Sequence, residues 1–522
     1  MYVSLKYMCK QFLLAAVICA ACFSASAQST KPALHFTVSV PNPAAKSFHV
    51  QLDGQGWAMD TIEFKLPNWM PGYYQLMDYA KSVENFTATG STGKSLTLDH
   101  PNGNTWRVVA NKKPFRISYD IKTQRKFVAS NYVDSAHAYI LSAGAFIHPA
   151  GHLNTPVTVQ VNNRWRDVAT GLEPVSGKKG VYAAPDFDIL YDCPILLADL
   201  ESFPSFRVNG IEHRFLAYNP GKFNDTLLMN NLKKIVSSSV AIIGDIPYKQ
   251  YTFIGIGSGQ GGIEHLNNTT VSFNGNGLNT EQGMNRILNF LAHEYFHHYN
   301  VKRIRPLELG PFDYDKGNRT NLLWVSEGLS VYYEYMVVKR AGLSTEQMLL
   351  SNFERNINAF ENGPGRSFQS LTQASYETWD SGPFGRQGKD ANKSISYYDK
   401  GPIAGLMLDF AIRHETNNQR SLDDVMRTLY WKYYKALGRG FSDAEFQDAC
   451  EIVAGTSLKD FFNYVYTAAP LDYEKYLGYA GLTVEVTPGA KENEKKFTIK
   501  RAQNLSELSK QIFESWMKPQ IN

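Results

Sequence analysis

The chain has few cysteines, and this scarcity excludes a scaffold held together by disulfides. Five cysteines occur in 522 residues, and three of them lie within the first 27. Only Cys193 and Cys450 remain beyond that segment. Small secreted domains that depend on disulfides carry far more cysteine than this. A bond between these two residues is compatible with an oxidising compartment, and the sequence leaves it open.

The chain also lacks a strong charge of either sign. Its 53 basic and 49 acidic residues give a formal net charge of +4, and Lys6 and Lys10 contribute two of those charges from the extreme N-terminus. A nearly neutral chain does not indicate a nucleic-acid partner. With 43% hydrophobic and 20% charged residues, the composition is typical of a soluble globular protein. The length predicts two to four domains.

Long hydrophobic runs are absent beyond the N-terminus. The basic start is followed by an apolar run over residues 12–23 and by Ala25-Ser26-Ala27, which is the pattern of a secretory signal peptide. The run is short for a membrane span, so export of residues 28–522 to the periplasm or the medium is favoured over a retained anchor. Lipid attachment at Cys22 ranks second, because Cys19 rather than a leucine stands three residues before it. No transmembrane helix is expected in the mature chain.

The first half of the mature chain has the pattern of a β domain. Apolar and polar residues alternate over 34–40, 115–121 and 157–161, as expected for strands with one buried face. Turn signals separate these runs, and no long amphipathic helix interrupts them. We therefore predict an all-β, sandwich-like domain over residues 28–215.

Helical spacing dominates after residue 223. Helices are predicted over 224–243, around the motif at residue 293, and over 322–340, with strands at 251–257 and 269–273. These segments form a predicted domain over 216–365, and a mostly helical domain follows over 366–480. The tail, 481–522, contains one strand-like run over 482–486, a short segment over 497–500 and a final helix over 505–516, and it is too short for another ordinary domain. The predicted fold class is thus α+β and multidomain.

The most informative motif is His293-Glu-Tyr-Phe-His297. Residues four apart lie on the same face of a helix, so the imidazoles of His293 and His297 can bind one metal ion. Glu294 then lies beside the metal, where a carboxylate can accept a proton from water.

A catalytic zinc site requires three protein ligands and leaves one position open. Glu327, within Trp324-Val-Ser-Glu-Gly328, is the candidate third ligand because it is a carboxylate in an otherwise apolar stretch. The alternative is an acidic residue that only stabilises a helix N-terminus. Together with the histidine motif, the pattern favours ligation.

A glycine-rich segment, Gly259-Gln-Gly-Gly-Ile-Glu-His265, lies between the two predicted strands. Gly261 and Gly262 would let a strand edge approach the backbone of a substrate closely. Glu264 can pair with the protonated amine of a substrate, which would make the enzyme an aminopeptidase. The alternative is a carboxylate in a solvated turn.

These motifs resemble those of the glycyl aminopeptidase family, which are gluzincin zinc metallopeptidases that usually carry a PDZ domain. The resemblance rests on His293 to Pro306, on the Glu327-Gly328 motif, on Gly261 to His265 and on Tyr398-Asp-Lys-Gly401, with further similarity at Trp69 to Tyr74 and at Tyr191 to Pro194. It implies a thermolysin-like catalytic domain that binds one zinc ion per chain. It also implies that Tyr398 stabilises the transition state and that Glu264 holds the substrate amine. The chain is expected to end without the PDZ domain.

The resemblance implies removal of small N-terminal residues, Gly or Ala, from peptide substrates. Three alternatives remain: a zinc endopeptidase that uses Glu264 only structurally, a non-catalytic peptide-binding protein on the same fold, and a purely structural zinc site. Nothing in the sequence indicates an oligomeric state.

Overall fold

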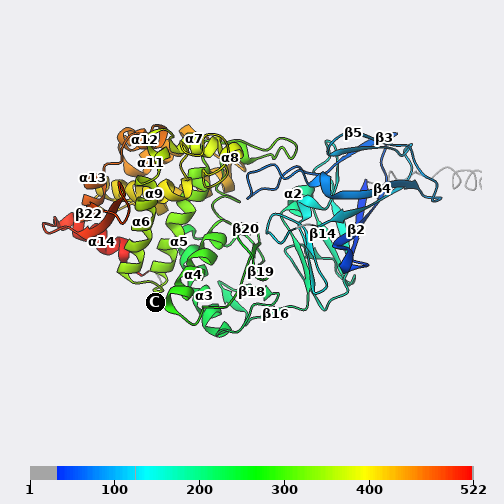
Figure 1. The fold of residues 1–522 in the computed structure, drawn as a ribbon, viewed down its shortest axis with the longest axis horizontal. Helices are drawn as coiled ribbons and strands as arrows, with labels where there is room; N and C mark the ends of the chain where they lie inside the picture. The colour runs from blue at the N-terminus through cyan, green and yellow to red at the C-terminus, as the bar shows by residue number, and fades with distance from the viewer. Residues whose placement is uncertain (1–31, 124, 520–522) are drawn as a thin grey trace, which may run out of the picture.

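The computed structural model describes residues 32–123 and 125–519, so the predicted signal segment and Cys22 lie outside the described residues. The described chain forms a β-rich lobe and a helical lobe, which lie side by side with the segment around β16–β20 between them (Figure 1). This arrangement agrees with the predicted change of pattern from strands to helices.

The β-rich lobe contains three sheets around one apolar core. The largest has seven strands: β13 (Glu173–Pro174), β14 (Val181–Ala184), β11 (Val157–Asn162), β1 (Ala33–Ser39), β2 (Ser47–Gln55), β7 (Phe115–Lys122) and β4 (Val83–Gly90), in that order. The second sheet comprises β10 (His148–Pro149), β3 (Thr61–Lys65), β6 (Thr105–Val109) and β5 (Leu98–Asn102), and the third comprises β12 (Asp167–Thr170), β15 (Ile195–Ala198), β9 (His137–Ile140) and β8 (Tyr132–Val133). Alternate residues of β1 and β2 are buried, and the core includes residues from all three sheets.

A six-stranded sheet connects the lobes. It contains β16 (Glu201–Ser202), β17 (Phe206–Val208), β18 (Ile211–Ala217), β19 (Gln250–Gly255), β21 (Asn268–Val271) and β20 (Gly262–Glu264). Strands β18, β19 and β21 are parallel, and β20 is an antiparallel edge strand. The predicted boundary at residue 215 therefore falls inside β18, because pairing of β18 with β19, a contact distant in sequence, draws residues 201–217 into this sheet.

The helical lobe is built around α9 (Tyr397–Glu415), which is buried along most of its length. Helices α3 (Asp225–Ile243), α4 (Glu281–Phe296), α5 (Leu329–Arg340) and α6 (Glu346–Glu361) lie beside the sheet and the central helix. Further helices and one π-helix complete the lobe: α7 (Leu371–Tyr376), α8 (Thr378–Ser381), α10 (Leu422–Thr428), η7 (Leu429–Ala436), α11 (Asp443–Ala454), α12 (Lys459–Tyr466) and α13 (Tyr473–Gly478). Short α2 (Phe187–Tyr191) belongs to the β-rich lobe.

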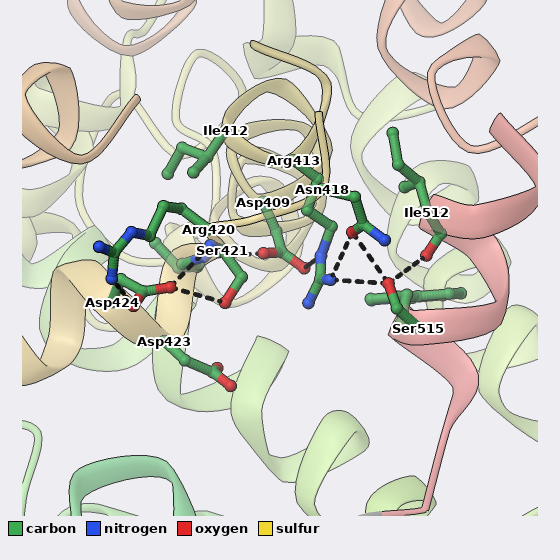
Figure 2. Close-up of polar contacts among 12 residues, drawn as sticks. Asp409, Ile412, Arg413, Asn418, Arg420, Ser421, Asp423, Asp424, Ile512 and Ser515 are labelled. Atoms are coloured by element: carbon green, nitrogen blue, oxygen red, sulfur yellow. Dashed lines mark hydrogen bonds and ion pairs between the residues drawn. The ribbon is translucent and has the colours of Figure 1, made fainter. Parts of the chain in front are cut away.

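The C-terminal tail forms the predicted strand and helix, and the segment around 497–500 forms a second strand. Strands β22 (Leu482–Pro488) and β23 (Lys495–Arg501) form a hairpin, and α14 (Glu507–Met517) packs against α9. Figure 2 shows the polar contacts at this junction, where Arg413 of α9 donates hydrogen bonds to Ser515 of α14 and to Asn418. The tail is thus an integrated part of the helical lobe.

Two further sequence questions are answered by the fold. Cys193 and Cys450 are both buried and both free, so they do not form a disulfide. Among the described residues, no helix has the length and apolar character that a bilayer crossing requires.

Candidate metal centre

Helix α4 brings the two histidines of the motif together. The side chain of Thr280 caps its N-terminus by accepting a hydrogen bond from the Gly283 amide, and the helix then buries one face. His293 lies in its last turn and His297 is its C-terminal cap. The two Nε2 atoms are 2.9 Å apart, and both rings are buried.

Glu327 lies across from this pair on a short π-helix, Trp324–Gly328, which precedes α5. Its Oε2 atom is 3.3 Å from Nε2 of His297 and 3.7 Å from Nε2 of His293. Zinc–ligand bonds of about 2.0–2.1 Å in a tetrahedron place ligand atoms roughly 3.3 Å apart. The three predicted ligands therefore fit a zinc ion. Burial by itself would raise the pKa of Glu327, but the two imidazoles outweigh burial and hold that pKa well below its usual range.

Two residues that the sequence reasoning missed lie against the Nδ1 atoms of the histidine rings. Glu334 of α5 places its Oε2 atom 2.9 Å from Nδ1 of His293, and the backbone carbonyl of Asn300 is 2.7 Å from Nδ1 of His297. Partners of this kind fix the ring orientation of metal-binding histidines. Glu334 lies seven residues, or two helical turns, after Glu327, and this spacing is a signal that a search of the sequence could have used.

Glu294 is buried beside the ligands and faces the edge strand β20. Its Oε2 atom has no hydrogen-bond partner among the described residues. A Cβ atom at Gly262 would lie 2.3 Å from Oε1 of Glu294, so a larger residue at this position would displace the Glu294 carboxylate. Burial raises the pKa of Glu294 to about 7.

Glu264 ends the edge strand and is 3% exposed, which rules out the alternative of a solvated turn. Its Oε1 atom has no hydrogen-bond partner among the described residues, although a buried carboxylate is costly without one. Gly72, from the β-rich lobe, packs against it, since a Cβ there would lie 2.9 Å from Oε2 of Glu264. The site is therefore completed by the other lobe.

Tyr74 is a further site residue that the sequence reasoning did not identify. Tyr74 lines the same small cavity as Glu264. Burial raises the pKa of Tyr74, and the charges of Glu327 and Glu264 raise it further. The sequence indicated its segment, Trp69 to Tyr74, only as a further point of similarity to the family.

Tyr398 lies at the start of α9 and donates a hydrogen bond of 2.9 Å to Oε2 of Glu327. Two glycines allow this approach. A Cβ at Gly401 would lie 2.5 Å from the Cα of Gly328, and a Cβ at Gly328 would lie 2.6 Å from the Cα of Gly401. The backbones of the Glu327 and Tyr398 segments are therefore in direct contact.

The space around the centre is asymmetric. A cavity of about 90 Å³ lies on the side of Glu264 and is lined by Gly72 and Tyr74. A cleft of about 1300 Å³ is lined by His293 and Glu294, by Gly261 and Gly262, and by further residues along one face of α4. The space beside Glu264 is thus small, whereas the cleft at the metal centre accommodates a long ligand.

Comparison with known families supports this description. The family model for the "Peptidase M61 N-terminal domain" matches residues 35–199, and the model for "M61 glycyl aminopeptidase" matches residues 286–404. Together the two ranges cover more than half of the chain. The chain belongs to the M61 glycyl aminopeptidase family.

Solved structures share the fold of this M61 family member. An aminopeptidase N family protein from Idiomarina loihiensis is 25% identical, with a TM-score of 0.82 over 88% of this chain and 80% of that chain. An M1 zinc metallopeptidase from Deinococcus radiodurans is 14% identical, with a TM-score of 0.51 over 84% of this chain and 94% of that chain. A mutant of that metallopeptidase, bound to a Tyr-Ser-Ala substrate, gives a TM-score of 0.52 at 15% identity over the same shares. No curated protein matches this chain.

The M61 chain is therefore a zinc metallopeptidase. The predicted fold class is confirmed as well: a β-rich N-terminal region, a thermolysin-like catalytic region and a helical C-terminal region.

Proposed function

We propose that this enzyme is an exported aminopeptidase that removes N-terminal Gly or Ala residues from peptides, with one zinc ion held by His293, His297 and Glu327. The observation that carries the proposal is the carboxylate of Glu264, which is buried beside the small cavity and whose Oε1 atom has no hydrogen-bond partner among the described residues. The ammonium group of a substrate N-terminus would supply the missing partner. A peptide anchored there can extend only into the open cleft, so cleavage occurs after its first residue.

The remaining residues are positioned for hydrolysis of that bond. Zinc, when bound, polarises the scissile carbonyl and lowers the pKa of water. Glu294 accepts the proton of the attacking water and passes it to the leaving amine. The hydroxyl of Tyr398 turns from Glu327 to donate to the carbonyl oxygen as negative charge develops there. Gly261 and Gly262 let the edge strand approach the substrate backbone.

Two further features support the finer parts of the proposal. Gly72 and Tyr74 limit the space beside Glu264, which favours a small first side chain. The N-terminal pattern of a secretory signal supports export to the periplasm or medium.

A panel of aminoacyl fluorogenic substrates, assayed with and without a chelator, tests the function. We expect Gly and Ala derivatives to be cleaved fastest and the chelator to abolish cleavage. N-acetylation of peptide substrates should prevent their hydrolysis, whereas an endopeptidase would cleave acetylated and free peptides alike. A zinc-containing protein without activity on any peptide would identify the binding-protein alternative.

A further inference from the structure

The walls of the cleft carry charges that the reaction does not use. Its lining includes four basic residues, Arg125, Lys126, Arg286 and Arg355, and two acidic ones, Glu294 and Glu334. Both acidic residues lie at the metal end: Glu294 follows His293, and Glu334 contacts the His293 ring. The part of the cleft away from the metal is therefore lined by cations without lining carboxylates.

Arg286 differs from the other three cations of the cleft in the contacts of its side chain. The guanidinium of Arg125 lies 4.3 Å from the ring centre of Phe127, and that of Arg355 donates a hydrogen bond to the Tyr335 hydroxyl. The ammonium of Lys126 lies near the rings of Tyr132 and Tyr218. Arg286 is exposed, and the lining residues that flank it on α4 carry no charge: Gln282, Asn285, Asn289 and Phe290. It is thus the cation best placed to meet a ligand.

The helix geometry sets the distance between Arg286 and the centre. Arg286 precedes His293 by seven residues, which places both on one face of α4 about 10 Å apart along the axis. An extended peptide advances about 3.3–3.6 Å per residue. In a peptide whose N-terminus is held by Glu264 and which follows the cleft along α4, the third residue after the scissile bond would lie at the level of Arg286.

We propose that Arg286 is a specificity-determining residue that binds a carboxylate on the third residue after the scissile bond. This inference rests on the proposed aminopeptidase function, because that function sets the direction of the peptide. The favoured substrates are tetrapeptides with a free C-terminus, or longer peptides with Asp or Glu as their fourth residue. Both sources present the same group, a carboxylate, to the same guanidinium.

The test compares matched peptides that differ in one charge. Tetra-alanine with a free C-terminus is compared with its C-terminal amide, and Ala-Ala-Ala-Glu-amide with Ala-Ala-Ala-Gln-amide, by measuring release of the first alanine at low ionic strength. We expect the charged peptide of each pair to have a kcat/KM about 2- to 5-fold higher, as for a partly exposed ion pair. A preference in only one pair identifies which carboxylate source reaches Arg286. High salt should bring the ratio of the two kcat/KM values in each pair closer to one.

Two variants assign the effect to Arg286. In Arg286→Gln the preference should disappear, and in Arg286→Glu it should reverse, with the peptide of each pair that lacks the carboxylate serving as the reference within each variant. Lys234→Gln, which removes the same charge from an exposed position on α3, should keep the preference. Equal rates for both members of both pairs, or a preference that survives in Arg286→Gln, would overturn the inference.

Failure of the proposed function gives a different result. If the wild-type protein does not hydrolyse alanyl-p-nitroanilide, which has no downstream carboxylate, the aminopeptidase proposal fails. If it hydrolyses that compound but shows no charge preference among the tetrapeptides, only the inference about Arg286 fails.

Discussion

Two glycines hold the third-ligand segment and the tyrosine segment in backbone contact. Gly328 and Gly401 face each other so closely that a methyl group on either would collide with the other. This contact lets the Tyr398 hydroxyl reach Glu327. The contact between Gly328 and Gly401 therefore both packs the two segments together and positions the Tyr398 hydroxyl.

Replacement of Gly401 by alanine should separate these segments. Overpacking of this kind costs about 1–3 kcal/mol, and a displacement of about 1 Å at a reacting group can reduce activity about 100-fold. We expect kcat on an alanyl substrate to fall at least 10-fold, with zinc still bound. Gly478→Ala is the control, because a Cβ there meets no atom within 4 Å. Full activity of Gly401→Ala would show that the close contact is not required.

Glu294→Gln tests the base directly. The amide keeps the shape of the carboxylate but cannot accept a proton, so kcat should fall by about 10²- to 10⁴-fold. Zinc content, measured by elemental analysis, should stay the same because Glu294 is not among the three proposed ligands. Loss of zinc together with activity would contradict this assignment.

At the scale of elements, the C-terminal helix α14 is joined to the helical lobe by both packing and hydrogen bonds. Trp516 is fully buried, and its indole nitrogen donates to the hydroxyl of Tyr332, which in turn donates to Asp409. Asp409 also accepts a hydrogen bond from Arg413, which contacts Ser515 (Figure 2). The tail therefore supports the helices that carry the site.

Trp516→Ala should destabilise the whole helical lobe. Removal of a buried tryptophan costs about 3–5 kcal/mol and leaves the Tyr332 hydroxyl without one partner. We expect a clearly lower midpoint of thermal unfolding, followed by circular dichroism. Lys510→Ala, on the exposed side of the same helix, should leave the midpoint unchanged. Equal midpoints for the two variants would mean that the tail is dispensable for stability.

At the scale of the whole molecule, Asp192 connects the lobes. It follows α2 in the β-rich lobe, and its carboxylate lies 2.5 Å from Nζ of Lys302 and accepts a hydrogen bond from the Leu266 amide. Burial alone would raise the pKa of Asp192, but Lys302 and His265 outweigh it and lower this pKa to about 2. Since the folded-state pKa is below the unfolded value of about 3.9, the carboxylate stabilises the fold at higher pH.

This link predicts a defined acid sensitivity. The stabilisation from Asp192, about 2 kcal/mol, is present above pH 4 and is lost as the pH falls from about 4 to about 2. Asp192→Asn should therefore lower the unfolding midpoint at pH 7 and weaken its decline between pH 4 and pH 2. Asp60→Asn, at an exposed carboxylate, is the control. An unchanged decline in Asp192→Asn would exclude the link as a source of acid sensitivity.

Much of the site could be predicted because its information is local. His293, Glu294 and His297 lie within one helical turn and a half, so their spacing alone places them on one side of a helix. Glu327 followed from a carboxylate in an apolar segment, whereas Tyr398 could be selected only through resemblance to a family. Glu334 and Tyr74 were missed because their roles depend on which segments pack together.

The sequence by itself determined the order of strands and helices, the ligand types and their spacing, because hydrophobic periodicity and helical geometry act over a few residues. Only the tertiary structure decided that Gly72 and Tyr74 from the β-rich lobe close one end of the site, that Glu264 is buried, and that residues 201–217 join the sheet between the lobes. These features arise from contacts between residues far apart in the chain, and they form only when both lobes pack against each other.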